Sequence, residues 1–299
     1  MRLPPRACVL VLALLLGLLS LAPPATGQEH KPGPLGPPLG PYREQEWFIQ
    51  WERNNRTWLA QAKIFRPEGS DKRPLVLIAH GAPRNPVGRV TLKPNWADVQ
   101  ARWFAAQGFV VVVPLRRGYG LSDGPVQESY GSCDQADFSA AGLTTANDIQ
   151  GVIETLAREP YVDPGRVVVV GYSAGGWGSL GVASRNPAGI VAVINFAGGR
   201  GSTSPGINCQ PERLIQVAEQ FGKTAKVPSL WLYTSNDTFF SADLSQKLFS
   251  AYATGGGPAE YKLMGSFGND GHYLFISATG TGEWTPVVTE FLRAQKLMR

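Results

Sequence analysis

Histidine and cysteine are scarce in this chain, whose 299 residues include three of each. No Cys-x-x-Cys pair occurs, so the usual spacing of zinc ligands is missing, and we expect neither a metal nor an organic cofactor. The net charge is +5 and the basic residues are scattered, which argues against nucleic acid as a partner. Beyond residue 21 no apolar run approaches the roughly 20 residues that cross a bilayer, so we expect no membrane span.

The first 27 residues have the pattern of a secretory signal peptide. Arg2 and Arg6 precede an apolar run over residues 7–21, and the small residues Ala25 and Gly27 occupy the two positions that a signal peptidase reads. We predict cleavage near Gly27 and export to the periplasm or the extracellular space. No cysteine follows the run at that point, so a lipoprotein anchor is not expected.

Cleavage would leave Cys133 and Cys209 in the mature chain. Two cysteines in an exported protein favour one disulfide, and two free buried thiols are the alternative. Residues 28–45 are rich in proline and glycine and cannot bury apolar surface. We therefore predict an extended tether over residues 28–45, followed by one folded domain over residues 46–299.

Short apolar runs alternate with helical patterns through the predicted domain. Strands are predicted over residues 47–51, 58–65, 75–79, 109–114, 167–170, 190–196, 229–234 and 259–263. Helices are predicted over residues 94–107, 145–159, 174–185, 211–221, 242–253 and 285–297. This order is typical of the α/β class. We expect an eight-stranded, mostly parallel sheet with helices on both faces, in which the first two strands form an antiparallel hairpin.

A serine lies at the junction of one strand and the helix after it. The segment Gly171–Gly175 reads G-x-S-x-G, with four valines before it and a helical pattern after it. In that context the motif places Ser173 on a tight turn as a nucleophile. A structural serine that caps the helix is the alternative.

A serine hydroxyl needs a base, and the base needs a carboxylate to orient it. His30 lies in the predicted tether and His80 ends a strand well before the serine, so His272 in "GNDGHYLF" is the candidate base. Asp237 follows a strong apolar strand and is the candidate acid. Asp270 is the second choice, because residues two apart in a loop rarely face each other.

Two backbone N–H groups are needed to bind the oxyanion that forms during acyl transfer. We assign them to Ala174, directly after the serine, and to Ala82 in "LIAHGAPRN".

Arg116, Arg117 and Arg200 could receive a substrate carboxylate, but a place on the surface is favoured. Aromatic residues next to these motifs are candidates for the pocket wall, with burial in the core as the alternative: Tyr119, Tyr172, Trp177, Phe239, Phe240 and Tyr273.

Together these motifs give the chain a family resemblance. The segments "HGAP", "RRGYGLSDGP", "GYSAGG", "SNDTFF" and "GHYLF" resemble the α/β-hydrolase superfamily over roughly residues 46–299, most closely its dienelactone-hydrolase-like and prolyl-oligopeptidase-like branches. The resemblance implies an α/β-hydrolase fold, here with a minimal lid, because residues 198–226 are short and glycine-rich. Two departures matter. Dienelactone hydrolases carry a cysteine where this chain has Ser173, and these residues hold no propeller domain of the prolyl oligopeptidase type.

The function predicted is an exported serine hydrolase that cleaves carboxylic esters through an acyl-enzyme. Its partner would be a small-molecule ester. A small serine peptidase would use the same three residues and is one alternative. A non-catalytic binding protein on a hydrolase scaffold is the other, although such proteins usually lack a member of the triad. The natural substrate and the oligomeric state stay open.

Overall fold

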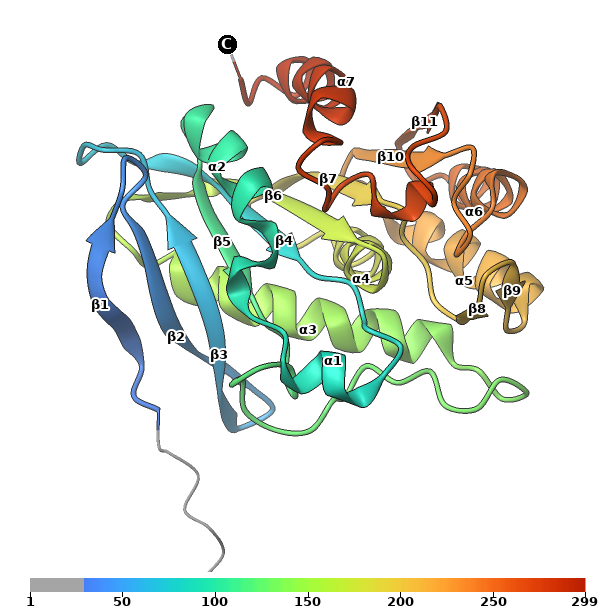
Figure 1. Ribbon diagram of the computed structural model, residues 1–299, viewed down its shortest axis with the longest axis horizontal. Coiled ribbons are helices and arrows are strands. Elements are labelled where there is room, and N and C mark those ends of the chain that lie inside the picture. Colours follow the sequence, from blue (N-terminus) through green and yellow to red (C-terminus); the bar gives the residue numbers. More distant parts are fainter. Residues whose placement is uncertain (1–29, 299) are drawn as a thin grey trace, which may run out of the picture. The chain divides into compact units, whose positions relative to one another are not determined.

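The central element of the computed structural model is a nine-stranded sheet with the order β1-β2-β3-β5-β4-β6-β7-β10-β11 (Figure 1). The structure describes residues 30–298, so the predicted signal peptide lies outside the described residues. From β5 to β11 neighbouring strands are parallel, whereas β1, β2 and β3 pair antiparallel. The bounds are β1 Gly33–Leu39, β2 Glu44–Arg53, β3 Arg56–Phe65, β4 Arg73–Ala79, β5 Val110–Pro114, β6 Val162–Tyr172, β7 Ile190–Phe196, β10 Ser229–Thr234 and β11 Ala259–Met264.

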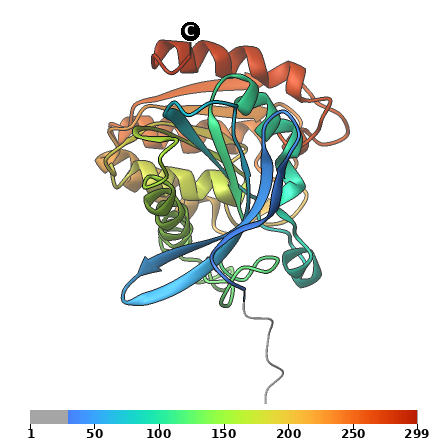
Figure 2. The ribbon, with the colours of Figure 1, turned by 90° about the vertical axis from the view of Figure 1, so that its left-hand side faces the viewer.

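Helices cover both faces of this sheet (Figures 1 and 2). Helices α2 (Asp98–Ala106) and α7 (Thr281–Ala294) share one hydrophobic core with the sheet. The opposite core contains α3 (Phe138–Leu156), α4 (Ala174–Ala183), α5 (Pro211–Thr224) and α6 (Ala242–Thr254). The α/β class and the helices on both faces are thus confirmed.

The alternation of side chains along β6 explains why its valine run is a central strand. Val167 and Val169 belong to one core, Val168 and Val170 to the other, and all four are at most 1% exposed. Successive side chains of a strand point to opposite faces. Burying each of them stabilises the fold by about 1.5–3 kcal/mol, so β6 is a rigid support for whatever follows it.

The predicted tether differs from the structure. Residues 33–39 form β1, an edge strand paired antiparallel with β2, where Gly33 lies opposite Phe48. This strand is the ninth that the prediction of eight did not include. Prolines cannot donate to a sheet ladder but are tolerated on an edge strand, and nearly every residue of β1 is exposed. Pairing of the backbone, rather than burial of side chains, places this segment in the sheet.

Two further elements differ from the expected boundaries. Helix α3 begins at Phe138, earlier than expected, because the Asp137 side chain caps it by accepting a hydrogen bond from the Ala140 N–H at 2.8 Å. The short helix α1 (Pro86–Val90) was not expected. Residues 198–226 contain a small hairpin, β8 (Ser202–Ser204) with β9 (Ile207–Asn208), followed by α5.

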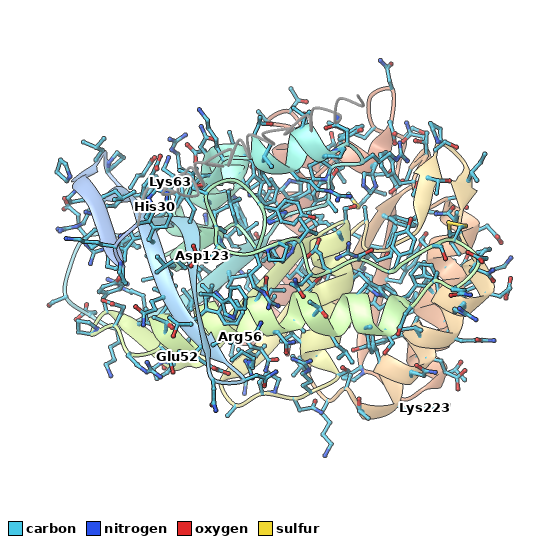
Figure 3. All side chains as sticks on the ribbon, turned by 90° about the horizontal axis from the view of Figure 1, so that it is seen from below. His30, Glu52, Arg56, Lys63, Asp123 and Lys223 are labelled. Atoms are coloured by element: carbon cyan, nitrogen blue, oxygen red, sulfur yellow. A yellow bond between two sulfur atoms is a disulfide. The ribbon has the colours of Figure 1, made fainter. Side chains whose placement is uncertain are left out.

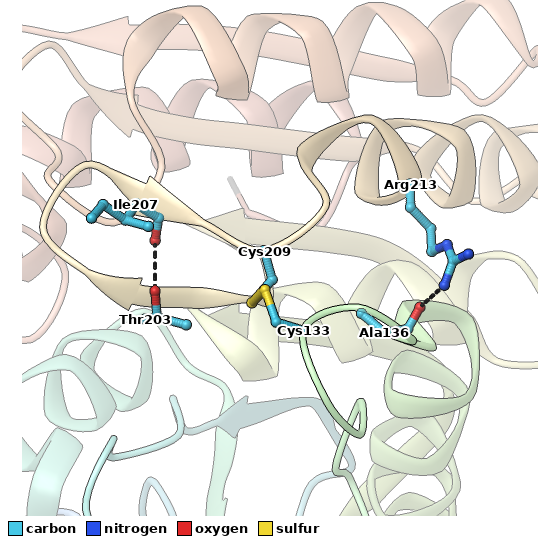
Figure 4. Close-up of a disulfide and its surroundings, with 6 residues drawn as sticks. All are labelled: Cys133, Ala136, Thr203, Ile207, Cys209 and Arg213. Carbon is cyan, nitrogen blue, oxygen red and sulfur yellow. Dashed lines mark hydrogen bonds between the residues drawn. A yellow bond between two sulfur atoms is a disulfide. The ribbon is translucent and has the colours of Figure 1, made fainter.

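A disulfide joins this hairpin to the loop before α3 (Figure 4). Cys133 and Cys209 are bonded, with their Cα atoms 5.1 Å apart, so the predicted pairing is confirmed. Arg213 of α5 reinforces the connection, because its Nη1 donates to the Ala136 carbonyl at 3.0 Å. The hairpin is therefore attached covalently to a segment 76 residues earlier in the chain.

The long loop between β5 and α3 is fixed to the sheet by polar contacts. Asp123, labelled in Figure 3, accepts a hydrogen bond from the Leu59 N–H at 2.8 Å. Ser122 Oγ accepts another from the Gln61 N–H at 2.9 Å and donates to the Leu115 carbonyl at 2.8 Å. These bonds to β3 hold the loop in place beside the carboxyl ends of the parallel strands.

Candidate active site

Ser173 occupies the sharp turn between β6 and α4. Its backbone has φ +53° and ψ −118°, a conformation that costs a residue other than glycine roughly 1–3 kcal/mol. The turn is possible because its flanking glycines leave no side chain in the way. A Cβ on Gly171 would lie 2.4 Å from the Gly175 carbonyl oxygen, and one on Gly175 would lie 2.2 Å from the Ala79 carbonyl oxygen.

The structure brings Ser173, His272 and Asp237 together. His272 Nε2 lies 3.1 Å from Ser173 Oγ, and His272 Nδ1 lies 3.0 Å from Asp237 Oδ2. Since a carboxylate only accepts, Nδ1 carries the proton and Nε2 is free to accept from the serine. The imidazole and the carboxylate are almost fully buried. A hydroxyl, an imidazole and a carboxylate in this order can activate the hydroxyl as a nucleophile.

Backbone groups fix the carboxylate and an aromatic ring covers the imidazole. Asp237 Oδ1 accepts from the N–H groups of Phe239 at 2.7 Å and Phe240 at 2.9 Å. The Phe239 ring stacks on His272 with centroids 3.9 Å apart and planes inclined by 10°. Asp270, the second-choice acid, instead accepts from the backbone N–H groups of Thr238 and His272 at 3.1 and 3.0 Å. It braces the two loops and does not contact the imidazole.

Ala174 and Ala82 both line a depression that contains Ser173. The Ala174 N–H is the first of α4, where no intrahelical acceptor exists. Ala82 lies in the loop after β4, and a Cβ on its neighbour Gly81 would be 3.2 Å from Ser173 Cβ. In the described part of the chain neither N–H donates to another protein group. Both are placed where they could bind an oxyanion formed at Ser173.

Two depressions meet at Ser173. One has a volume of about 390 Å³, and its polar wall includes Tyr119, Glu128, Arg200 and Thr203. The other has a volume of about 370 Å³, and its more apolar wall includes Leu92, Trp96, Tyr172 and Ile276. Ser173 therefore faces a polar side and an apolar side.

Five of the six aromatic residues predicted for the pocket wall line these depressions: Tyr119, Tyr172, Phe239, Phe240 and Tyr273. Trp177 does not, and that prediction was wrong. Its ring is fully buried in the core, where Nε1 donates to the Phe138 carbonyl at 2.8 Å. It lies one helical turn beyond Ser173, where α4 faces α3. Trp96 was missed because it lies far from any motif in the sequence.

The arginines expected at the surface are mostly buried. Arg116 is 3% exposed and Arg200 7% exposed, and both bind Glu128. Burial would raise the pKa of the Glu128 carboxyl, but the charges of Arg116 and Arg200 hold it well below its usual range. Arg117 is paired with Asp148 at 2.6 Å. Two cations and one anion thus lie beside the polar depression, a cluster with a net positive charge.

Residues 60–272 match the dienelactone hydrolase family, and the chain belongs to this family. The fold and the family together make the protein a hydrolase of the α/β type. No cluster of three or more potential metal ligands occurs among residues 30–298. In the same range no helix has the length and apolar character that crossing a bilayer requires.

Similar proteins include both peptidases and esterases. Dipeptidyl-peptidase 5 from Porphyromonas gingivalis is 27% identical over 161 residues, which cover 52% of this chain and 21% of the relative. Acylaminoacyl peptidase from Pyrococcus horikoshii has a TM-score of 0.61 at 18% identity, covering 85% of this chain and 42% of that one. An esterase from Pyrococcus furiosus has a TM-score of 0.57 at 16% identity, covering 85% and 93%. The chain thus spans about a fifth of its curated relative and under half of the acylaminoacyl peptidase, and the structural likenesses concern the fold alone.

Proposed function

We propose that this protein is a serine hydrolase that cleaves carboxylic esters through an acyl-enzyme. The observation that carries the proposal is the His272 imidazole, which bridges Ser173 Oγ at 3.1 Å and Asp237 Oδ2 at 3.0 Å. A serine that merely capped α4 would not need this arrangement, and Ser173 makes no side-chain cap bond.

The reaction has two steps of the same kind. Ser173 Oγ attacks the ester carbonyl carbon while His272 Nε2 takes the hydroxyl proton, and the carbonyl oxygen becomes an oxyanion bound by the Ala82 and Ala174 N–H groups. When the oxyanion collapses, the bond to the alcohol oxygen breaks and His272 returns the proton to that oxygen. Water then attacks the acyl-enzyme with His272 as base, which releases the acid and restores Ser173. Asp237 keeps the imidazole oriented and stabilises its charged form.

The two depressions indicate what shape of substrate fits. The apolar side, with Trp96 and Tyr172 stacked at 6.2 Å between ring centroids, suits a hydrocarbon or aryl group. The polar side, with Arg200 and Glu128, suits a part of the substrate that is rich in oxygen. We expect an ester with one group of each character, joined at the carbonyl that reaches Ser173.

A small serine peptidase is the second candidate, because two of the similar proteins are peptidases by name. The same triad would serve both reactions, so substrates must separate them. Hydrolysis of simple aryl esters together with inertness toward aminoacyl arylamides supports the esterase. The reverse pattern supports the peptidase.

Export is part of the proposal. The Cys133–Cys209 disulfide supports it, because structural disulfides persist in oxidising compartments. Secretion of the full chain with loss of its first 27 residues, measured by intact mass, is the expected result. Retention of these residues in the secreted protein would contradict a cleaved signal peptide.

Labelling by a fluorophosphonate tests the nucleophile without a known substrate. Ser173 Oγ should displace fluoride from phosphorus, giving a single adduct visible by intact mass and mapped to Ser173. Ser173→Ala should take no label, and His272→Ala should label at least 100 times more slowly. A folded wild-type protein that stays unlabelled would contradict the proposal.

A further inference from the structure

A buried group of polar side chains packs against the loop that carries Ala82, and two of its members, His80 and Glu128, also line the depressions at Ser173. His80 is 1% exposed, Arg116 3% and Glu128 4%, and neither His80 nor Arg116 has a place in the reaction described above. Their hydrogen bonds converge on two peptide groups, His80–Gly81 and Gly81–Ala82. The second of these contains the N–H that we assign to the oxyanion.

The hydrogen bonds of His80 define its protonation. Its Nε2 receives the backbone N–H of Arg116 at 3.1 Å, and its Nδ1 lies 2.6 Å from the Gly81 carbonyl oxygen. A backbone N–H can only donate and a carbonyl can only accept, so Nδ1 bears the proton and the ring is neutral. Burial and the neighbouring Arg116 charge lower the pKa of His80 well below its usual value, in keeping with this tautomer.

Arg116 binds the same loop from the other side. Its Nη1 donates to the His80 carbonyl at 2.6 Å and its Nη2 approaches the Gly81 carbonyl at 3.4 Å. Glu128 holds the guanidinium in a two-point contact, from Nε to Oε2 and from Nη2 to Oε1, the latter at 2.9 Å. A planar guanidinium held at two points has little freedom to rotate, so the positions of both carbonyls are fixed.

The direction of the Ala82 N–H follows from these contacts. In a trans peptide the C=O and the N–H point in opposite directions. The Gly81 carbonyl points into the buried group, so the N–H of Ala82 points away from it. Ala82 lines both depressions at Ser173, and Gly81 packs directly against Ser173. The N–H therefore faces the space where the oxyanion would form.

We propose that Arg116, oriented by Glu128, and His80 are positioning residues that preorganise the oxyanion hole by fixing the Gly81–Ala82 peptide. The proposal rests on the proposed function, since it needs acyl transfer at Ser173. Beyond the triad, the proposal names residues that influence the rate by fixing the direction of one backbone N–H. Loss of one such donor typically costs about 10²–10³ in rate.

The experiment compares Arg116→Lys with Arg117→Lys. Both arginines are paired with a buried carboxylate, but Arg117 contacts Asp148 and the rings of Trp51 and Trp58 and has no bond to the loop of Ala82. Lysine keeps the positive charge but loses the planar guanidinium that makes the two-point contact. We expect Arg116→Lys to lower kcat by about 10²-fold or more with KM within about threefold, and Arg117→Lys to stay within about threefold in both.

The adduct of Ser173 with an aryl trifluoromethyl ketone tests oxyanion stabilisation directly. A purely structural role of Arg116 would leave this measurement unchanged. Ser173 Oγ adds to the carbonyl carbon of the ketone, the hydroxyl proton passes to His272, and the carbonyl oxygen becomes a stable oxyanion. With a ¹³C-labelled carbonyl, NMR reports the pH at which this oxygen is protonated. A 100-fold loss of stabilisation would raise that pH by about two units in Arg116→Lys, with no comparable change in Arg117→Lys.

Each outcome has a meaning. A selective effect of Arg116→Lys supports the proposal, whereas equal effects of the two lysine variants, small or large, overturn it. Should Arg116→Lys not fold, as judged by circular dichroism, His80→Asn replaces it in the same comparison with the same decision. A wild-type protein without esterase activity or fluorophosphonate label would instead defeat the proposed function itself.

Discussion

The two N–H groups assigned to the oxyanion are held by different means. The Ala174 N–H is set by the backbone alone, because it opens α4 directly after the turn at Ser173. The Ala82 N–H is set by side chains, because Arg116 lies 36 residues from His80 in the sequence yet binds its carbonyl. One donor thus follows from a local motif, and the other depends on contacts between distant segments. Substitutions far from Ser173 can therefore disable one donor and leave the other intact.

The largest effect should come from a change that impairs the base and leaves both N–H donors in place. Asp237→Asn would favour the wrong tautomer of His272 and should lower kcat by about 10⁴. Asp270→Asn is the control, since within residues 30–298 Asp270 bonds only to backbone N–H groups and Thr238 Oγ1, and it should cost less than about tenfold. Ester hydrolysis measured on both variants checks this. A larger loss in Asp270→Asn would reassign the acid.

A smaller effect, on stability, should appear when the side-chain support of Ala82 is removed. Glu128→Ala leaves the Arg116 and Arg200 guanidinium groups buried without their carboxylate. Breaking a buried pair in this way typically costs about 3–5 kcal/mol, to be measured by urea unfolding. The matched control is Glu154→Ala, whose partner Arg53 lies at the surface, and it should cost less than about 1 kcal/mol. Equal losses of unfolding free energy would show that the buried cluster contributes no more to stability than a surface ion pair does.

The smallest effect should appear as a pH dependence of stability. The pKa of His80 is lowered in the folded protein by burial and by Arg116 and Arg200, against the opposing charge of Glu128. The unfolded chain therefore binds the extra proton first, and the free energy of unfolding falls as the pH drops below about 6.5. His80→Asn should reduce that slope by up to about 1.4 kcal/mol per pH unit. Urea unfolding between pH 7.5 and 5.5 tests it, and parallel curves for the two proteins would contradict it.

Local patterns made most of the fold and the arrangement at Ser173 predictable. The valine run of β6, the glycines around Ser173 and the chain order of serine, acid and base are all visible in the sequence. The structure brings these three residues together, while their catalytic roles remain predictions. Eight of the nine strands of the main sheet were expected for the same reason, since each carries apolar residues in a run or in alternation.

Features that depend on contacts between segments far apart in the sequence could not be predicted from local patterns. Arg116 looked like a surface residue because nothing in the sequence links it to the His80 carbonyl or to the buried Glu128. Trp177 is adjacent to the motif, yet the side of α4 on which it lies is decided by the position of α3. Strand β1 was missed because its backbone pairs with β2 while its side chains stay exposed.

The disulfide has a mechanical consequence. The covalent ring that it closes runs from Cys133 to Cys209 and includes Ser173, whereas Asp237 and His272 lie outside it. Once the noncovalent structure has unfolded, force applied to the two ends of the chain passes through the disulfide, and the residues inside the ring are not extended. Fully stretched, the oxidised chain should be shorter than the reduced chain by about 250 Å, because the two cysteines are 76 positions apart in the sequence.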